Sequence, residues 1–250
     1  MVIYNKKRNR TVRSLEWKGI VRMRRLQSRS KSLYLLMIVV AVVYMLYVTY
    51  VNFIHDPQAA EFLSHKTGLK RPVVLPIWLN VMYVHIVFAC VAMIAGAINF
   101  STKILSKHRR LHRVNGYLYL LSVAVVVLTS GYMAPYSTGG KINSIAFNVM
   151  NLIFMGLTVA AIVQIKRKQV DSHRKWMVRS YAFCFTNLFI HMFTFVFHNG
   201  FGVEYALSYT LGVYGALVLN FALAELVIRC IYTRPAAIVP PGNKKDKAIA

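Results

Sequence analysis

The stretch HRKWMVRSYAFCFTNLFIHMFTFVFH, residues 173–198, decides the fold class of this chain. Its first third is basic and ends at Arg179, and the apolar remainder is long enough to cross a bilayer. A helix in lipid buries its polar side chains against protein. We therefore expect a membrane-spanning helix with one polar line facing the interior of a bundle. That line has helical spacing and consists of Ser180, Cys184, Asn187, His191, Thr194 and His198.

Five further apolar segments reach spanning length in a chain that is 57% hydrophobic. We predict an all-α fold, a polytopic membrane helical bundle with six transmembrane helices. The membrane domain covers residues 33–232, between a basic cytoplasmic arm at 1–32 and a disordered cytoplasmic tail at 233–250. The predicted spans are about 33–54, 77–99, 117–135, 145–165, 180–198 and 205–228.

The charge of the chain is strongly one-sided, with 31 Lys and Arg against 7 Asp and Glu. In a soluble protein this balance would suggest nucleic acid, but here the basic residues separate apolar spans, so no nucleic acid is expected. Six spans place both termini on one side, and 27 of the 31 cations fall on that side. The positive-inside rule then predicts that the N and C termini are cytoplasmic, with anionic lipid headgroups as partners.

Histidines fall into two tiers of the predicted bundle. His85 and His191 lie on the inward lines of two spans, each about 10–12 Å below the outer boundary. Two inward histidines at equal depth could hold a bis-His haem b. His112 and His173 form a second tier at the cytoplasmic surface, which could ligate another haem. Structural histidines satisfied by neighbouring polar groups, a divalent metal and a quinone are the alternatives.

Other polar residues of the spans and loops have their own interpretations. Small residues on the His85 line, among them Gly96, allow close approach of a neighbouring helix. Glu225 and Arg229 are four apart on the last span and could form an ion pair on one helix face. Four loop arginines could lie at the headgroup level or cradle a lipid phosphate or an anionic substrate. These are Arg109, Arg113, Arg174 and Arg179.

Several reaction classes lack their sequence signatures. The chain has no P-loop, no G-x-G-x-x-G, no H-E-x-x-H and no G-x-S-x-G, and no pair of carboxylates for acid–base work within its spans. A hydrolase or a kinase is therefore not expected. The three cysteines lie within or at the end of apolar spans, which favours packing over a disulfide framework.

Two loop elements, read with the preceding span, resemble a known family over about residues 80–195. The segments are HIVFACVAMIAGAINF, HRRLHRVNGYLYLLS and DSHRKWMVRSYAF. They are similar to the bacterial membrane proteins catalogued as domain of unknown function 2306, with their H-R-x-x-G-x-x-Y and H-R-x-W-M-x-R-S elements. The resemblance implies a multi-pass protein of the bacterial cytoplasmic membrane without an assigned reaction. The matching positions are His85, His112, Arg113, Gly116, Tyr119, His173, Arg174, Trp176, Met177, Arg179 and Ser180.

Two functions of different classes follow from these residues. The first is a redox protein that carries electrons through haem b held by the histidine tiers. The second is a membrane module without a cofactor that binds lipid, a small solute or a protein partner through the cytoplasmic Arg/His loops. The sequence leaves open whether the chain is an enzyme and which metal, if any, it binds.

Overall fold

The computed structural model describes residues 31–65 and 73–232. The predicted tail and most of the predicted basic arm lie outside these residues. Six helices are long and apolar enough to cross a membrane, and the described part of the chain has no strand. The prediction of an all-α, six-span bundle is therefore confirmed. The spans are Lys31–His55, Leu75–Asn99, Arg109–Tyr136, Lys141–Lys166, Val170–Gly200 and Tyr205–Tyr232.

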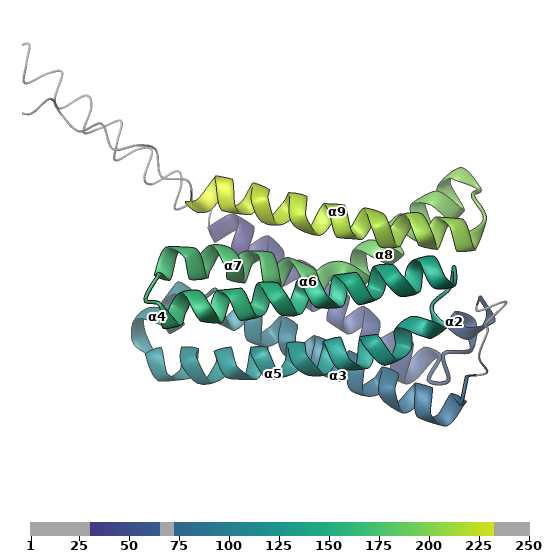
Figure 1. Ribbon diagram of the computed structural model, residues 1–250, viewed down its shortest axis with the longest axis horizontal. Helices are drawn as coiled ribbons and strands as arrows, with labels where there is room; N and C mark the ends of the chain where they lie inside the picture. The colour runs from purple at the N-terminus through teal and green to yellow at the C-terminus, as the bar shows by residue number, and fades with distance from the viewer. Residues whose placement is uncertain (1–30, 66–72, 233–250) are drawn as a thin grey trace, which may run out of the picture.

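Shorter elements join or extend the spans (Figure 1). The first span ends in a π-helical turn, and a short helix, α2, follows it. A second short helix, α4, connects the second and third spans. The elements after the first span's long α-helix are η1 Val51–His55, α2 Ala60–Ser64, α3 Leu75–Asn99, α4 Thr102–Lys107, α5 Arg109–Met133, η2 Ala134–Tyr136, α6 Lys141–Lys166, α7 Val170–Ala182, η3 Phe183–Phe185, α8 Thr186–Phe195, η4 Val196–Gly200 and α9 Tyr205–Tyr232.

The spans pack mainly as neighbouring pairs. α3 lies along α5, α6 along α7, and α8 along α9, while α5 also contacts α6 and α7 also contacts α9. One apolar core runs through all six spans and includes Tyr44 of the first span and Val213 of α9. A smaller buried cluster holds Trp78, Met82 and Ile86 of α3. Many other large apolar side chains are exposed on the outer faces of the spans, as expected for helices that face lipid. Both ends of the described chain lie at the α4 end of the bundle (Figure 1).

A tight turn between η2 and α6 depends on glycine. Gly139 and Gly140 both have positive φ, at 82° and 67°, a region that L side chains rarely adopt. A Cβ on Gly139 would also collide with the Asn143 side chain. Asn143 is fully buried and donates hydrogen bonds to the Thr138 carbonyl and the Thr210 hydroxyl. The turn is thereby tied to α9.

The fifth span is not one continuous α-helix, and this changes which side chains face inward. The 3₁₀ segment η3 separates α7 from α8. A 3₁₀ residue advances about 120° rather than about 100°, so three such residues rotate the following helix by roughly 60°. Ser180 and Thr194 are buried as predicted, but Asn187, His191 and His198 are exposed. The prediction of an inward position is therefore wrong for His191 and His198, whereas Asn187 still donates to the hydroxyl of the buried Tyr44 on the first span at 3.0 Å.

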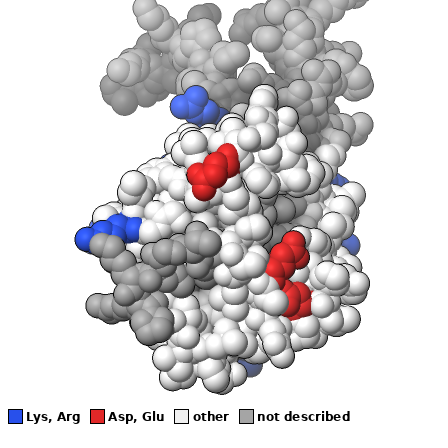
Figure 2. Space-filling view, turned by 90° about the vertical axis from the view of Figure 1, so that its right-hand side faces the viewer, with Lys and Arg blue, Asp and Glu red and all other residues white. Residues whose placement is uncertain are grey.

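The two ends of the bundle differ in charge. One end is formed by α2 and by the first turns of α6 and α9. Its surface is largely uncharged, with acidic side chains exposed on it (Figure 2). The opposite end holds α4, the starts of α5 and α7, and the end of α9. Among the described residues, Asp171 and Glu225 are the acids near that end, against eleven Lys and Arg within 103–113 and 166–179. We call it the basic end.

Candidate functional site

The two loop elements recognised in the sequence meet at the basic end of the bundle. His112 lies in the first turn of α5 and His173 in the first turn of α7. Both side chains are half-buried, and His112 is close enough to His173 and Arg174 for their charges to act on it. The structure therefore brings together the predicted cytoplasmic histidine tier.

His173 is held in one orientation by a neighbouring span. Its Nδ1 lies 2.8 Å from the carbonyl oxygen of Ala161 on α6, and a carbonyl can only accept. The hydrogen-bond network thus assigns the proton of the neutral ring to Nδ1 and leaves the lone pair on Nε2. This arrangement, with one ring nitrogen bonded to a backbone carbonyl, is typical of histidines that ligate a metal.

A fully buried hydroxyl network lies one to two turns deeper. The Ser180 hydroxyl is 2.7 Å from the Tyr119 hydroxyl on α5 and 2.7 Å from the Thr158 hydroxyl on α6. The Cys184 thiol lies 3.8 Å from the same Tyr119 oxygen. Ser180, Tyr119 and Thr158 are each at most 1% exposed. Because these side chains come from three different spans, the network fixes α7 against α5 and α6.

A second set of polar contacts joins α3 to the start of α5. Asn115 donates hydrogen bonds to the Ala95 carbonyl at 2.6 Å and to the Asn99 side chain at 2.9 Å. Asn99 in turn lies against the backbone of His112 and Gly116. Gly116 lies directly against this contact, because a Cβ there would be 3.7 Å from Asn99, an ordinary van der Waals distance. The position of His112 is therefore set by α3.

Arg179 of α7 forms an ion pair with Glu225, the one acidic residue in the half of α9 near the basic end. Its Nε is 2.6 Å from Oε1 of Glu225, and its guanidinium lies over the Trp176 ring at 4.8 Å. Among the described residues the direct partner of Glu225 is thus Arg179 of α7, while Arg229, its predicted partner, acts on the carboxylate through its charge. The reason is reach, because α7 packs along α9 and presents a forked guanidinium to the carboxylate.

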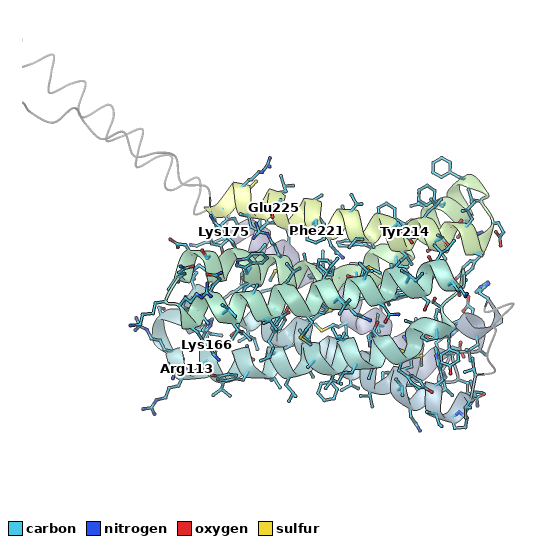
Figure 3. All side chains as sticks on the ribbon, viewed as in Figure 1. Arg113, Lys166, Lys175, Tyr214, Phe221 and Glu225 are labelled. Atoms are coloured by element: carbon cyan, nitrogen blue, oxygen red, sulfur yellow. The ribbon has the colours of Figure 1, made fainter. Side chains whose placement is uncertain are left out.

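Three further arginines at this end form no ion pair within the described part of the chain. Arg109, Arg113 and Arg174 are exposed, and among the described residues none forms an ion pair. Lys175 lies near the Glu225 carboxylate, where its charge adds to that of Arg179 (Figure 3). The basic end is thus a surface with excess positive charge next to the His112–His173 pair.

The predicted outer tier, His85 and His191, is distributed over two helix pairs. His85 is half-buried on α3, and its Nδ1 is 2.9 Å from the Thr129 hydroxyl on α5. That hydroxyl donates to carbonyls of its own helix, so it accepts from His85, whose lone pair is then on Nε2. His191 is exposed on α8, which packs on α9. The pair therefore stays a prediction without a contact to support it.

The amino-acid sequence alone does not predict the hydroxyl network. Tyr119 and Ser180 belong to the family elements, yet nothing in the sequence links them to Thr158. The available signal is helical spacing, which puts Thr158 on one line of its span with Asn148 and Asn151. Among the described residues no group of three or more His, Cys, Asp or Glu side chains is placed to hold a metal. The three cysteine thiols are free.

Comparison with known proteins agrees with the resemblance in the sequence. A family model described as "Predicted membrane protein (DUF2306)" matches residues 82–228, from the second span to near the end of the sixth. No curated protein and no solved structure matches the chain. The matched region contains both histidine elements, the hydroxyl network and Glu225. The chain therefore belongs to the DUF2306 family of multi-pass membrane proteins.

Proposed function

We propose that this protein is a redox protein that holds haem b at the basic end, with His112 and His173 as the axial ligands. The observation on which this depends is the hydrogen bond from His173 Nδ1 to the Ala161 carbonyl, which leaves Nε2 free to coordinate. His112 lies on the neighbouring α5, within electrostatic range. Cofactor sites of helical bundles are commonly built from side chains on facing helices.

The residues around this pair suit such a group. Arg174 and Arg113 are exposed cations beside the two histidines and would bind the propionate groups. The hydroxyl network and the α3–α5 contacts would hold the two ligand helices at a fixed separation. Haem iron, when bound, supplies one-electron transfer. His85, with the same Nδ1 anchoring, is the candidate ligand of a second haem, and His191 remains its predicted partner.

A second function is favoured by the excess of positive charge. Arg109, Arg113 and Arg174 have no carboxylate partner among the described residues, and arginine matches phosphate geometry well. In this alternative the protein is a membrane module without a cofactor. It binds an anionic headgroup, a small anionic solute or an acidic protein partner through these arginines.

The visible absorption spectrum of detergent-purified protein tests the first proposal. We expect a Soret band in the oxidised protein and sharp α and β bands after dithionite, when the cells are supplied with haem. His173→Ala and His112→Ala should each remove these bands. His108→Ala is the matched control, because His108 is an exposed histidine at the same end, and it should leave the spectrum unchanged.

Each outcome separates the hypotheses. A flat spectrum from folded, well-expressed protein would overturn the haem proposal and direct attention to the arginines. In that case binding of vesicles containing phosphatidylglycerol should fall in the triple variant Arg109→Gln, Arg113→Gln, Arg174→Gln. Bands that persist in His173→Ala but disappear in His85→Ala would move the haem to the outer tier.

We also propose that the membrane is the bacterial cytoplasmic membrane and that the basic end faces the cytoplasm. The charge difference between the two ends supports this orientation through the positive-inside rule. The histidine pair would then lie at the cytoplasmic boundary, where a soluble electron donor or acceptor could reach it.

A further inference from the structure

An apolar groove runs along the outer side of α8 and α9, away from the histidines. Phe193 of α8 and Phe197 of η4 form one wall, and α9 forms the other. The groove is shallow and open to the outside, with a volume of about 500 Å³, and its lining is almost entirely apolar. The α9 residues that line it include Leu211, Gly215, Val218 and Ala222.

Gly215 lets the Phe193 ring pack directly on α9 in the wall of the groove. A Cβ at this position would lie 3.1 Å from two ring atoms of Phe193, tighter than ordinary van der Waals contact. A larger side chain would therefore push the Phe193 ring out of its place and change the shape of the groove. From Leu211 to Ala222 the groove extends about 16 Å along α9, at 1.5 Å per residue. This length is about that of one whole leaflet, since the hydrocarbon core of a bilayer is about 30 Å thick.

The line of groove residues continues on the same helix face into a charged cluster. After Leu211, Gly215, Val218 and Ala222, the next positions at steps of three and four are Glu225 and Arg229. The Glu225 carboxylate is already paired with Arg179, and the charges of Arg229 and Lys175 also act on it. Three cations against one acid leave this end of the groove positive. Figure 3 shows Tyr214 at the groove and Glu225 toward the basic end of α9.

We propose that the groove is a binding site for one anionic phospholipid. An acyl chain lies against Phe193 and Gly215, and the phosphate lies near Arg229 and Lys175, about 10 Å beyond Ala222 along the helix. Charge complementarity selects an anionic headgroup over a zwitterionic one, since each nearby Lys or Arg attracts anionic lipid. This site is separate from the haem proposal, because it uses α8, α9 and Lys175 of α7 and neither His112 nor His173.

Native mass spectrometry of the full chain, released from mixed micelles with phosphatidylglycerol and phosphatidylethanolamine, tests this site. We expect one phosphatidylglycerol to stay bound to the unaltered protein. Gly215→Leu should lower its affinity by roughly tenfold, the effect of displacing about two CH₂ groups of the acyl chain. Arg229→Gln should lower it about fivefold. Gly156→Leu is the matched control, because Gly156 is an exposed glycine of α6 with open space around it, and it should retain the lipid.

Several results would overturn the proposal. Equal retention of phosphatidylglycerol in Gly215→Leu and the unaltered protein would show that the groove holds no chain. If Arg229→Gln loses the bound phosphatidylglycerol and Gly215→Leu retains it, the protein binds the headgroup alone and not the acyl chain. Equal binding of phosphatidylethanolamine would contradict selection by charge. Val218→Phe adds a bulky residue at an exposed position of the same groove and repeats the test if Gly215→Leu fails to fold.

Discussion

At the scale of single residues, Gly96 shows how closely the spans approach each other. It is buried on α3, and a Cβ there would collide with the Tyr181 ring of α7. The Tyr181 hydroxyl donates to the Met93 carbonyl at 2.9 Å, so the ring is held at its far end as well. The small-residue line predicted for this span is therefore an interface between α3 and α7, because only a glycine lets the ring lie on the helix backbone.

Substitution of Gly96 by alanine tests this contact. Because the ring cannot move without losing its hydrogen bond, Gly96→Ala should lower the free energy of unfolding by about 1–3 kcal/mol, the typical cost of overpacking. Thermal unfolding in detergent, followed by circular dichroism, measures the change. Gly156→Ala, at an open helical position, should be neutral or stabilising, since alanine is the better helix former. Equal midpoints for both variants would contradict the tight contact.

At the scale of elements, the ion pair between Arg179 and Glu225 fastens α7 to α9. The two side chains are 22% and 42% exposed, so solvent weakens the pair and we expect a coupling energy of about 0.5–1 kcal/mol. A double-mutant cycle with Arg179→Gln and Glu225→Gln, scored by unfolding free energy, measures it. The parallel cycle of Glu225→Gln with Arg229→Gln should give a smaller coupling. A larger coupling energy for Glu225 with Arg229 than for Glu225 with Arg179 would instead support the pair expected from the i,i+4 spacing on α9.

At the scale of the whole molecule, the uneven distribution of charge predicts the orientation of the bundle in the membrane. If the basic end is cytoplasmic, a fluorescent protein fused after Ala250 should fold and fluoresce in bacterial cells, because such fusions mature in the cytoplasm. Alkaline phosphatase inserted after Gly140, in the turn at the opposite end, should be active only outside the cytoplasm. Activity of the phosphatase when fused after Ala250 would contradict the orientation, since the cytoplasm keeps its disulfides reduced.

The number and length of the spans follow from the sequence, because a bilayer requires about 20 apolar residues per helix and every backbone group satisfied within it. The sequence also indicated the two histidine elements and the close approach at Gly96, since these depend on local spacing. The inward position predicted for His191 failed because a 3₁₀ segment of three residues rotates α8, which no hydropathy pattern reports.

The tertiary structure alone decided which partners the polar side chains have. Glu225 could pair with Arg229 on its own helix, but packing brings Arg179 of α7 within 2.6 Å. Ser180 could face any neighbour, and only the assembled bundle joins it to both Tyr119 and Thr158. The physical reason is that span formation depends on local backbone and lipid energetics, whereas side-chain pairing depends on the rotation and neighbours that each helix acquires when the bundle packs.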